Sequence, residues 1–546
     1  MKGSGFFLRT GSPSEVTINR DPTHDRLRNE VGRVGLRRDC ALRLARRICV
    51  QWRILGLLAL LSSIHLATAA PDPTPQQEPV SAQQKGSVIR VNSTNQSYDF
   101  FRPWNKQAPG GRRGLGVLID GNKVLVTAEL VTNSDYVELE RPDGGAKMSA
   151  TVQVIDYEAN LALLNPADPN FLQGMAPLEV DPNARTGDKL SVLQLESNGT
   201  PVSTQALVTS VEVGRYALED SGYLMLRLSC PLQFRENSFT LPITKENKLA
   251  AFLMRYDSRS QAVDAISGPV IEHFLKEAQH QPYRGFPRAG MEISPTRDPQ
   301  LRRYLKLQDS DGGVYVNEIE RAGPAEKAGI RPGDVLVAIG DKQVDPDGNY
   351  VHPFYGKLSI THLTTTEAYS GQTITVTVIR DGERKRLKME LFRKPPEDYA
   401  VDPYFTGQQP RYYILGGIVL QELSRPFLRE WGTNWVHAAP QRLVYADRYQ
   451  SELFTDKRKI VFVSQVLATQ DTVGYEQLTY PVLTRLNGRE IKSLDDVAEA
   501  VKQPADGFHK LEFDQDPREI YLDAKQVEEN APQLQKMYAL PALSHL

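Results

Sequence analysis

The sequence predicts a mainly β protein built from several domains, and three observations support this prediction. First, a chain of 546 residues exceeds the size of a single hydrophobic core. Second, short apolar segments bounded by turns, with few helical patterns between them, fill residues 87–270, which is typical of a β-barrel or sandwich. Third, two later stretches share the order strand, helix, strand, turn, helix, which indicates a diverged duplication of an α+β unit.

These patterns divide the chain into six segments. We expect an N-terminal extension with a signal peptide over residues 1–69, and a Pro/Gln-rich linker over residues 70–86. The β-rich domain follows and closes with a helix. The complete set of expected boundaries is 1–69, 70–86, 87–281 for the β-rich domain, 284–393 for the first α+β unit, 394–530 for the second, and 531–546 for a C-terminal tail.

The leader is predicted from charge and hydropathy. An arginine-rich segment precedes the apolar run at residues 54–66, and small residues follow it up to Ala69. This run is shorter than the roughly 20 residues that a spanning helix needs. We therefore expect cleavage near Ala69, export to a periplasmic or other extracytoplasmic compartment, and no stable membrane span in the mature form. A signal anchor and an arginine-rich organelle presequence are the alternatives.

Composition limits the partners and cofactors. The net charge is −2, from 65 basic and 67 acidic residues, so no overall field attracts nucleic acid and no such partner is expected. Cys230 is the only cysteine after residue 69, so the mature chain has no internal disulfide and no CxxC motif for a metal. We expect no cofactor, no metal, and a buried, apolar role for Cys230.

The most specific motif is GPAEKAGIRPGDVLVAIGDKQV at residues 323–344. It resembles a PDZ domain of the HtrA/Deg family. The resemblance implies that the loop Arg288, Ala289, Gly290 and Met291 is a peptide-binding loop whose backbone N–H groups receive a C-terminal carboxylate. Glycine permits close approach, successive N–H groups attract an anion, and the next strand can accept a peptide by β-augmentation. The alternative is an ordinary tight turn.

The second α+β unit is similar to the second PDZ domain of plant-type Deg proteases. The segment YYILGGIVLQELSRPFLREWGTNW at residues 412–435 carries this resemblance. The equivalent loop falls at residues 417–420, between bulky residues and an aromatic-rich insert. We therefore expect it to serve packing or oligomerisation rather than peptide capture.

A Deg-like C-terminal half implies that the β-rich domain is a chymotrypsin-like double β-barrel with a trypsin-like peptidase ancestry. The stretch VLVTAELVT resembles the family's strand that carries the catalytic histidine, and ANLALL at residues 159–164 resembles the motif of the catalytic aspartate. By position, the histidine corresponds to Glu129, the aspartate to Asn160, the nucleophile to Ser238 and an oxyanion-loop glycine to Glu236.

The chemistry at these positions argues against peptide hydrolysis. A serine attacks a carbonyl only when a base removes its proton and donors hold the oxyanion, and a carboxylate with a pKa of about 4.3 is a weak base for a hydroxyl. Residues 71–272 contain no histidine, since the nine histidines are at positions 24, 65, 273, 280, 352, 362, 437, 509 and 545. A dyad of Ser238 with Lys245 or Lys248, or with Glu129 in acid, is the active alternative.

We therefore expect an exported pseudoprotease that acts as a peptide-binding scaffold or chaperone-like module. The alternative is an active HtrA-type serine endopeptidase in protein quality control, with an altered catalytic site. The expected partners are protein C-termini or unfolded peptides. A trimer-based homo-oligomer is also expected, because aromatic N-terminal segments of HtrA proteins pack at a trimer interface. In this chain these aromatic residues either do so or cover the barrel of their own subunit; they are Tyr98, Phe100, Phe101 and Trp104.

Overall fold

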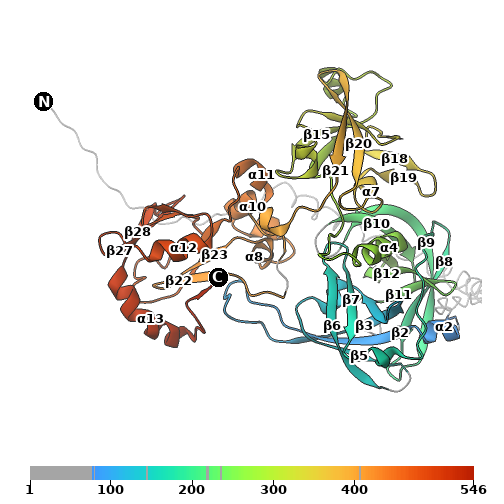
Figure 1. The fold of residues 1–546 in the computed structure, drawn as a ribbon, viewed down its shortest axis with the longest axis horizontal. Coiled ribbons are helices and arrows are strands. Elements are labelled where there is room, and N and C mark those ends of the chain that lie inside the picture. Colours follow the sequence, from blue (N-terminus) through green and yellow to red (C-terminus); the bar gives the residue numbers. More distant parts are fainter. Residues whose placement is uncertain (1–76, 79, 143–144, 217–220, 234–236, 405–406) are drawn as a thin grey trace, which may run out of the picture. The chain divides into compact units, whose positions relative to one another are not determined.

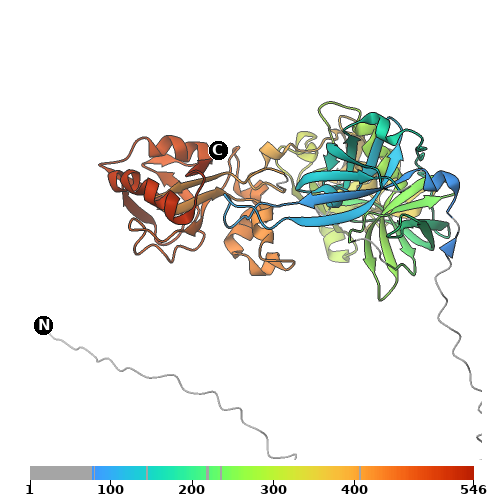
Figure 2. The ribbon, with the colours of Figure 1, turned by 90° about the horizontal axis from the view of Figure 1, so that it is seen from below.

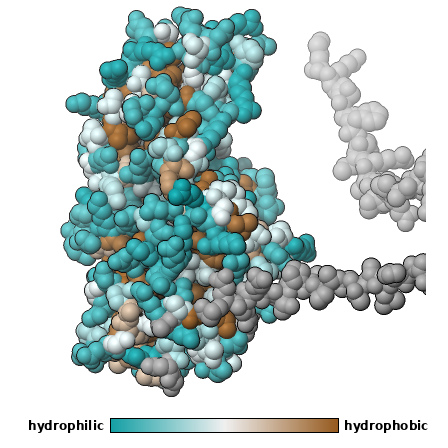
Figure 3. All heavy atoms as spheres, turned by 90° about the vertical axis from the view of Figure 1, so that its right-hand side faces the viewer, coloured by the Kyte–Doolittle hydropathy of each residue, from teal (hydrophilic) through white to brown (hydrophobic). Residues whose placement is uncertain are grey.

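The computed structural model describes residues 77–546, apart from residues 79, 143–144, 217–220, 234–236 and 405–406 (Figure 1). The expected leader and cleavage site at residues 1–69 lie outside the described residues, as does Glu236. Within the described part of the chain, no helix is both long enough and apolar enough to cross a bilayer. The face drawn in Figure 3 is largely hydrophilic, with small separate apolar patches.

The first barrel is a closed sheet of six antiparallel strands in the order β2-β3-β4-β7-β6-β5. Its interior is filled by alternating apolar side chains such as Val124 and Val126 on one short strand. A single turn of helix, α3 (Ala128–Val131), leaves the end of β4. The strands are β2 (Val88–Asn95), β3 (Gly110–Ile119), β4 (Lys123–Val126), β5 (Ser134–Glu140), β6 (Lys147–Asp156) and β7 (Leu161–Pro166).

The second barrel follows the order β1-β9-β10-β13-β12-β11-β8, and an additional β8–β9 pairing closes it. The predicted double β-barrel is therefore confirmed. Cys230 is buried and free in its core, and burial raises the pKa of its thiol to about 12. The elements are β1 (Gln77–Glu78), α2 (Ala82–Lys85), η2 (Pro169–Leu172), β8 (Lys189–Leu195), β9 (Pro201–Arg215), β10 (Gly222–Ser229), β11 (Pro242–Lys245), β12 (Lys248–Asp257), β13 (Ala262–Ser267) and α4 (Gly268–Glu277).

The expected linker over residues 70–86 is partly wrong, because its described portion belongs to the second barrel. Strand β1 pairs with β9, and Val80 packs in the barrel core. The Gln84 amide is buried and donates a hydrogen bond of 2.9 Å to the Thr244 hydroxyl. The Pro/Gln composition predicts a free connection, but the backbone of this segment pairs with β9 and the Gln84 side chain binds β11.

The first PDZ unit, residues 284–393, has a sheet in the order β14-β15-β16-β20-β21, so that β14 lies at an edge. Helix α7 contacts β10 of the second barrel, and Figure 1 shows the two side by side. The elements are β14 (Met291–Pro295), α5 (Pro299–Tyr304), β15 (Val314–Ile319), α6 (Pro324–Lys327), β16 (Val335–Ile339), β17 (Lys342–Gln343), β18 (Asn349–His352), β19 (Gly356–Ser359), α7 (Thr361–Thr364), β20 (Thr373–Arg380) and β21 (Glu383–Glu390).

The second PDZ unit, residues 394–546, contains two four-stranded sheets, β24-β23-β22-β29 and β26-β25-β27-β28. A helical insert at residues 425–453 separates β23 from β24. The elements are η3 (Pro396–Asp398), β22 (Tyr412–Leu415), β23 (Ile418–Glu422), α8 (Arg425–Arg429), α9 (Trp435–Ala438), α10 (Gln441–Arg448), α11 (Gln450–Leu453), β24 (Val461–Val466), β25 (Leu483–Leu486), β26 (Arg489–Glu490), α12 (Leu494–Val501), β27 (Phe508–Phe513), β28 (Glu519–Asp523), α13 (Ala524–Tyr538) and β29 (Ser544–His545).

The expected C-terminal tail at residues 531–546 is wrong, because this segment completes the second PDZ unit. The expected boundary falls inside α13, and Leu534 and Leu540 are buried in an apolar cluster of this unit. Strand β29 then pairs with β22. Burial of these leucines and the added strand fix the segment to the unit.

The aromatic residues Tyr98, Phe100, Phe101 and Trp104 lie neither at a position ahead of the barrel nor on the barrel of their own subunit. Residues 96–109 form a loop between β2 and β3, here called the aromatic loop, rather than a segment ahead of the barrel. Phe101 packs edge-on against Phe427 and Trp431, with ring centroids 5.6 and 5.1 Å apart, and Trp104 packs against Tyr412 at 5.9 Å. The loop therefore packs on the second PDZ unit of its own chain, and Figure 2 shows it reaching the helical insert.

Candidate functional site

Glu129 lies on α3, directly after the β4 strand. Its backbone N–H donates a hydrogen bond of 2.9 Å to Asn160 Oδ1, and its carbonyl accepts one from the Arg112 guanidinium. Burial raises the pKa of the Glu129 carboxyl, and the nearby charge of Arg112 opposes this shift. The structure therefore places two of the three expected positions, Glu129 and Asn160, in direct contact through a backbone amide.

Asn160 ends the turn between β6 and β7, with a left-handed backbone φ of 54° that asparagine tolerates well. A hydrogen bond of 2.8 Å from the Ala159 N–H to Asp156 Oδ1 holds the turn. The Asn160 side chain is fully buried, and its Nδ2 has no hydrogen-bond partner among the described residues. Because its oxygen accepts from a backbone amide, Asn160 orients no base.

Ser238 is also buried, with 3% of its surface exposed. Its hydroxyl lies 3.0 Å from the Thr240 hydroxyl and accepts a hydrogen bond of 3.2 Å from the Thr240 N–H. The Thr240 hydroxyl in turn bonds that of Thr127, the N-cap residue of α3. This chain of hydroxyls brings Ser238 close to the Glu129 helix, but no base contacts Ser238 among the described residues.

The candidate replacements for the missing base have other partners. Lys245 pairs with Asp188 and Lys248 with Glu179, each at 2.7 Å. His273 stacks between the rings of Phe286 and Tyr369, with centroids 4.0 and 4.2 Å away. Burial lowers the pKa of His273, so it is a neutral packing side chain between α4 and the first PDZ unit.

The expected peptide-binding loop, Arg288 to Met291, begins beside Phe392, which lies at the end of the first PDZ unit. The Arg288 N–H donates to the Phe392 carbonyl at 3.3 Å. The Arg288 guanidinium pairs with Glu158 at 3.0 Å and donates to the Ser221 hydroxyl at 2.5 Å. Both partners belong to the double barrel, so the guanidinium of this loop is directed at the barrels.

The next two residues have the arrangement of an anion site. The Ala289 carbonyl accepts from the Ala325 N–H at 3.0 Å, and the Gly290 carbonyl accepts from the Glu320 N–H at 2.9 Å. Within the described residues, the N–H groups of Ala289 and Gly290 donate no hydrogen bond. Gly290 has a φ of 68°, and an added Cβ would lie 3.2 Å from Pro324 Cδ. The loop therefore offers two unpaired amides at a position that requires glycine.

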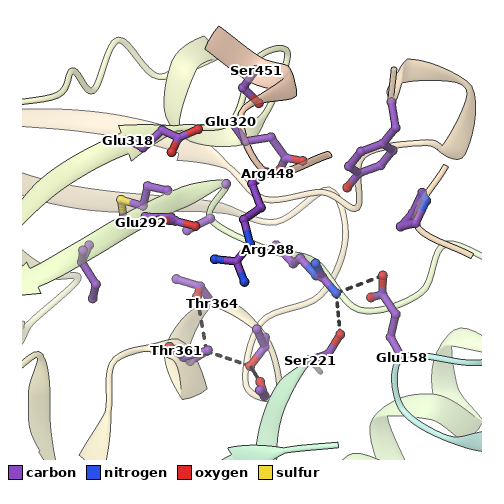
Figure 4. A pocket seen from close by; sticks show the side chains of 18 of the residues that line it. Glu158, Ser221, Arg288, Glu292, Glu318, Glu320, Thr361, Thr364, Arg448 and Ser451 are labelled. Atoms are coloured by element: carbon purple, nitrogen blue, oxygen red, sulfur yellow. Dashed lines mark hydrogen bonds and ion pairs between the residues drawn. The ribbon is translucent and has the colours of Figure 1, made fainter. Parts of the chain in front are cut away.

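A cavity of about 680 Å³, part of which is drawn in Figure 4, is lined by the four residues of this loop. Strand β14 runs along it and pairs only with β15 among the described strands, so its other edge is free for a peptide strand. The helical insert of the second PDZ unit supplies a further wall, which includes Arg448 and Tyr449. Apolar lining comes from Met291, Ile293, Ile339 and Ile360.

The equivalent strand of the second PDZ unit has no such edge. Strand β23, which contains most of the expected loop at residues 417–420, pairs with β22 on one side and β24 on the other. An added Cβ on Gly417 would lie 2.8 Å from the Leu467 carbonyl oxygen. This arrangement supports the packing role that we expected for the second loop.

Comparison with known proteins agrees with this architecture. Two family models described as PDZ domains match residues 304–391 and 401–544. Over 433 residues the chain is 26% identical to "Protease Do-like 2, chloroplastic" of Arabidopsis thaliana, covering 78% of this chain and 70% of the relative. The chain belongs to the Deg/HtrA family. A second relative, "Putative protease Do-like 11, mitochondrial" of the same plant, is 26% identical over 437 residues, again 78% and 70% of the two chains.

Among solved Deg/HtrA structures, "HtrA-type protease AlgW with decapeptide" matches with a TM-score of 0.43 and 20% identity, over 57% of this chain and 97% of the other. The second PDZ match extends to residue 544 and so includes all of α13 and the first residue of β29.

Several residues of these sites had no signal in the sequence. Thr127 has the sequence context of an ordinary threonine, and Glu158 has that of a solvated charge in a turn. Arg448 stands in a helix far along the chain from the peptide-binding loop. Only the tertiary structure brings Arg448 and Glu158 to the same cavity as Arg288.

Proposed function

We propose that this Deg/HtrA protein is catalytically inactive and binds protein C-termini or unfolded peptides in its first PDZ unit. The observation that carries the binding proposal is the pair of unpaired amides at Ala289 and Gly290, two residues that line a cavity beside the free edge of β14. A peptide carboxylate supplies the acceptor oxygens that these amides lack, and its backbone can extend the sheet.

Inactivity is supported by the surroundings of Ser238. Its hydroxyl exchanges hydrogen bonds with Thr240 rather than with a base. In a serine protease, loss of the catalytic histidine alone costs about a millionfold in kcat. Glu129 is no substitute, because its carboxyl would have to remove a proton from a hydroxyl whose pKa is far higher.

The competing proposal is an active serine endopeptidase, which the names of the relatives and the retained Ser238 favour. A fluorophosphonate probe and a casein assay distinguish the two, with Ser238→Ala as the matched control. We expect neither labelling nor cleavage from pH 4 to 9. Labelling that disappears in Ser238→Ala would show that the site works as a nucleophile and would refute inactivity.

Peptide binding can be tested without knowing the natural ligand. A library of random decapeptides with free C-termini is selected on the full chain, and the enriched peptide is synthesised as the acid and as the C-terminal amide. Fluorescence polarisation should show at least tenfold weaker binding of the amide, because hydrogen bonds to a charged group contribute about 1.5–3 kcal/mol. Selection without any C-terminal consensus contradicts the proposal.

A glycine pair provides the control for the loop. Gly290→Trp places a large side chain against Pro324 and should abolish binding. Gly356 also has a positive φ, of 76°, but nothing lies within 4 Å of an added Cβ there. Gly356→Trp should therefore have the same backbone strain and retain wild-type affinity.

Assembly and export remain predictions. The aromatic loop, on which the trimer was expected to depend, packs on the second PDZ unit of its own chain, so sedimentation analysis is needed to test a homo-oligomer.

We propose from the leader's composition that residues 1–69 direct export. A mature N-terminus near Ala70 would support this, and uptake of a leader–reporter fusion by isolated organelles would favour the presequence alternative.

A further inference from the structure

Figure 4 shows the Arg448 side chain reaching from the helical insert into the cavity of the first PDZ unit, which is also lined by Thr364 and by the loop that begins at Arg288. We propose that Arg448 is the cation that receives the carboxylate of a bound peptide C-terminus. The second PDZ unit would thus complete the peptide site of the first. This inference rests on the proposed function and adds the residue that binds the negative charge of the peptide's C-terminal carboxylate.

The peptide-binding loop has no cation of its own to offer. Its arginine, Arg288, is directed to Glu158 and Ser221 of the double barrel, at 3.0 and 2.5 Å. Moving this guanidinium to a ligand would leave the buried Glu158 with a 3.5 Å ion pair to Arg393 and a hydrogen bond of 3.2 Å from the Tyr223 hydroxyl. The loop therefore contributes neutral amides, and the charge of a carboxylate must be balanced by another group.

Arg448 is available for this task. It is exposed, and among the described residues its guanidinium forms neither an ion pair nor a hydrogen bond. Arg425 and Asp447 line the same cavity but bind each other, with nitrogen–oxygen distances of 3.1 to 3.3 Å. Their charges are mutually compensated, so that Arg448 is the uncompensated charge of the insert wall.

The position of Arg448 is fixed by its neighbours. It is the last residue of α10, and the preceding Asp447 is buried and held by Arg425. Two residues later, Gln450 Oε1 accepts hydrogen bonds from the N–H groups of Ala400 and Val401 at 3.0 and 3.2 Å. Contacts on both sides of Arg448 thus hold the backbone at the end of this helix in place. Less conformational entropy is lost when Arg448 binds a ligand from a backbone that is already ordered.

The remaining charges of the cavity favour the same orientation of a peptide. Glu292 and Glu318 are register partners on β14 and β15 and have no cationic partner among the described residues. Burial raises the pKa of Glu318, and the nearby charges of Glu292 and Glu452 raise it further. A carboxylate is repelled from these strands and attracted towards the loop end, where Arg448 lies. Among the described residues, the other lining cation without an ion pair is Arg215, at the end of β9.

The test compares four full-length proteins with the acid and amide forms of the peptide selected on the wild type. Arg448→Gln removes the proposed cation, Arg215→Gln removes the other lining cation, and Arg386→Gln removes an exposed cation of β21 that does not line the cavity. We expect Arg448→Gln to weaken binding of the acid about tenfold and to leave binding of the amide within twofold. Arg386→Gln should change neither, and Arg215→Gln should have less effect than Arg448→Gln.

Each other outcome has a definite meaning. If the wild type selects no C-terminal consensus, the proposed function fails and this inference fails with it. If the wild type binds and Arg448→Gln does not alter the preference for acid over amide, the function stands and the role of Arg448 is refuted. Tighter binding by Arg448→Gln would mean that the insert obstructs the site, and a larger loss in Arg215→Gln would assign the carboxylate to Arg215; both refute the proposal.

Discussion

Asp156→Asn should loosen the attachment of the first PDZ unit to the double barrel. The Asp156 carboxylate is fully buried; its Oδ2 receives the Arg393 guanidinium at 3.0 Å and the Tyr283 hydroxyl at 2.7 Å. The asparagine has nearly the same shape but removes the charge, so Arg393 loses its main anionic partner. Breaking a buried pair in this way costs about 3–5 kcal/mol.

The structure sets the expected cost at the lower end of that range. Arg393 keeps Glu158 at 3.5 Å and the Tyr404 hydroxyl at 2.7 Å, so its charge is not fully orphaned. We therefore expect about 3 kcal/mol, which corresponds to roughly a hundredfold faster hydrogen exchange in segments that open when this contact breaks. These segments are residues 283–290 and 393–404.

Hydrogen exchange followed by mass spectrometry measures this effect segment by segment. Asp120→Asn, which removes the same charge from an exposed position at the end of β3, is the control and should change nothing. Since the Phe392 carbonyl holds the Arg288 N–H, Asp156→Asn should also weaken peptide binding. A change of less than threefold in both segments, with unaltered peptide affinity, would refute this account of the contact.

Three further predictions follow from single side chains. Gly290→Ala should weaken peptide binding about tenfold in a polarisation assay, because a left-handed alanine costs about 1–2 kcal/mol and its Cβ displaces the amides. Glu129→Gln should have a higher melting temperature than the wild type at pH 7 and an equal one near pH 4. The pKa of Glu129 is raised in the folded state, so the wild type loses stability as the pH rises from the unfolded to the folded pKa. Phe101→Ala should destabilise the second PDZ unit by about 1–2 kcal/mol in urea unfolding followed by Trp431 fluorescence, since it removes two edge-to-face ring contacts; an unchanged midpoint would contradict the packing seen.

The parts of the fold that could be predicted are those governed by local patterns. The consecutive apolar and β-branched residues at 124–126 indicate a buried strand, and the acid after it does lie where β4 ends, on α3. Gly290 was expected to need close backbone approach, and its positive φ fits that expectation. In both cases the chemistry of the residue and its immediate neighbours decides the conformation.

The parts that could not be predicted depend on contacts between distant segments. An aromatic loop must cover some apolar surface, but its composition does not say whether Phe101 meets a barrel, another subunit or Phe427. A strand of two residues, Ser544–His545, is too short for any periodicity. Arg448 has the sequence context of a solvated helix surface, and only its location in the cavity gives it a role.

The packing of the aromatic loop also has a consequence for synthesis of the chain. Phe101 leaves the ribosome about 330 residues before Trp431, its ring partner. At 5–20 residues per second, the nascent loop waits about 15–65 s with its rings uncovered, even if the barrel that carries it has already folded. The nascent chain thus exposes an apolar aromatic surface that is buried in the complete protein. A chain truncated before the helical insert would expose this surface permanently. Holdase chaperones should therefore bind the nascent chain at this loop and release it when the second PDZ unit emerges.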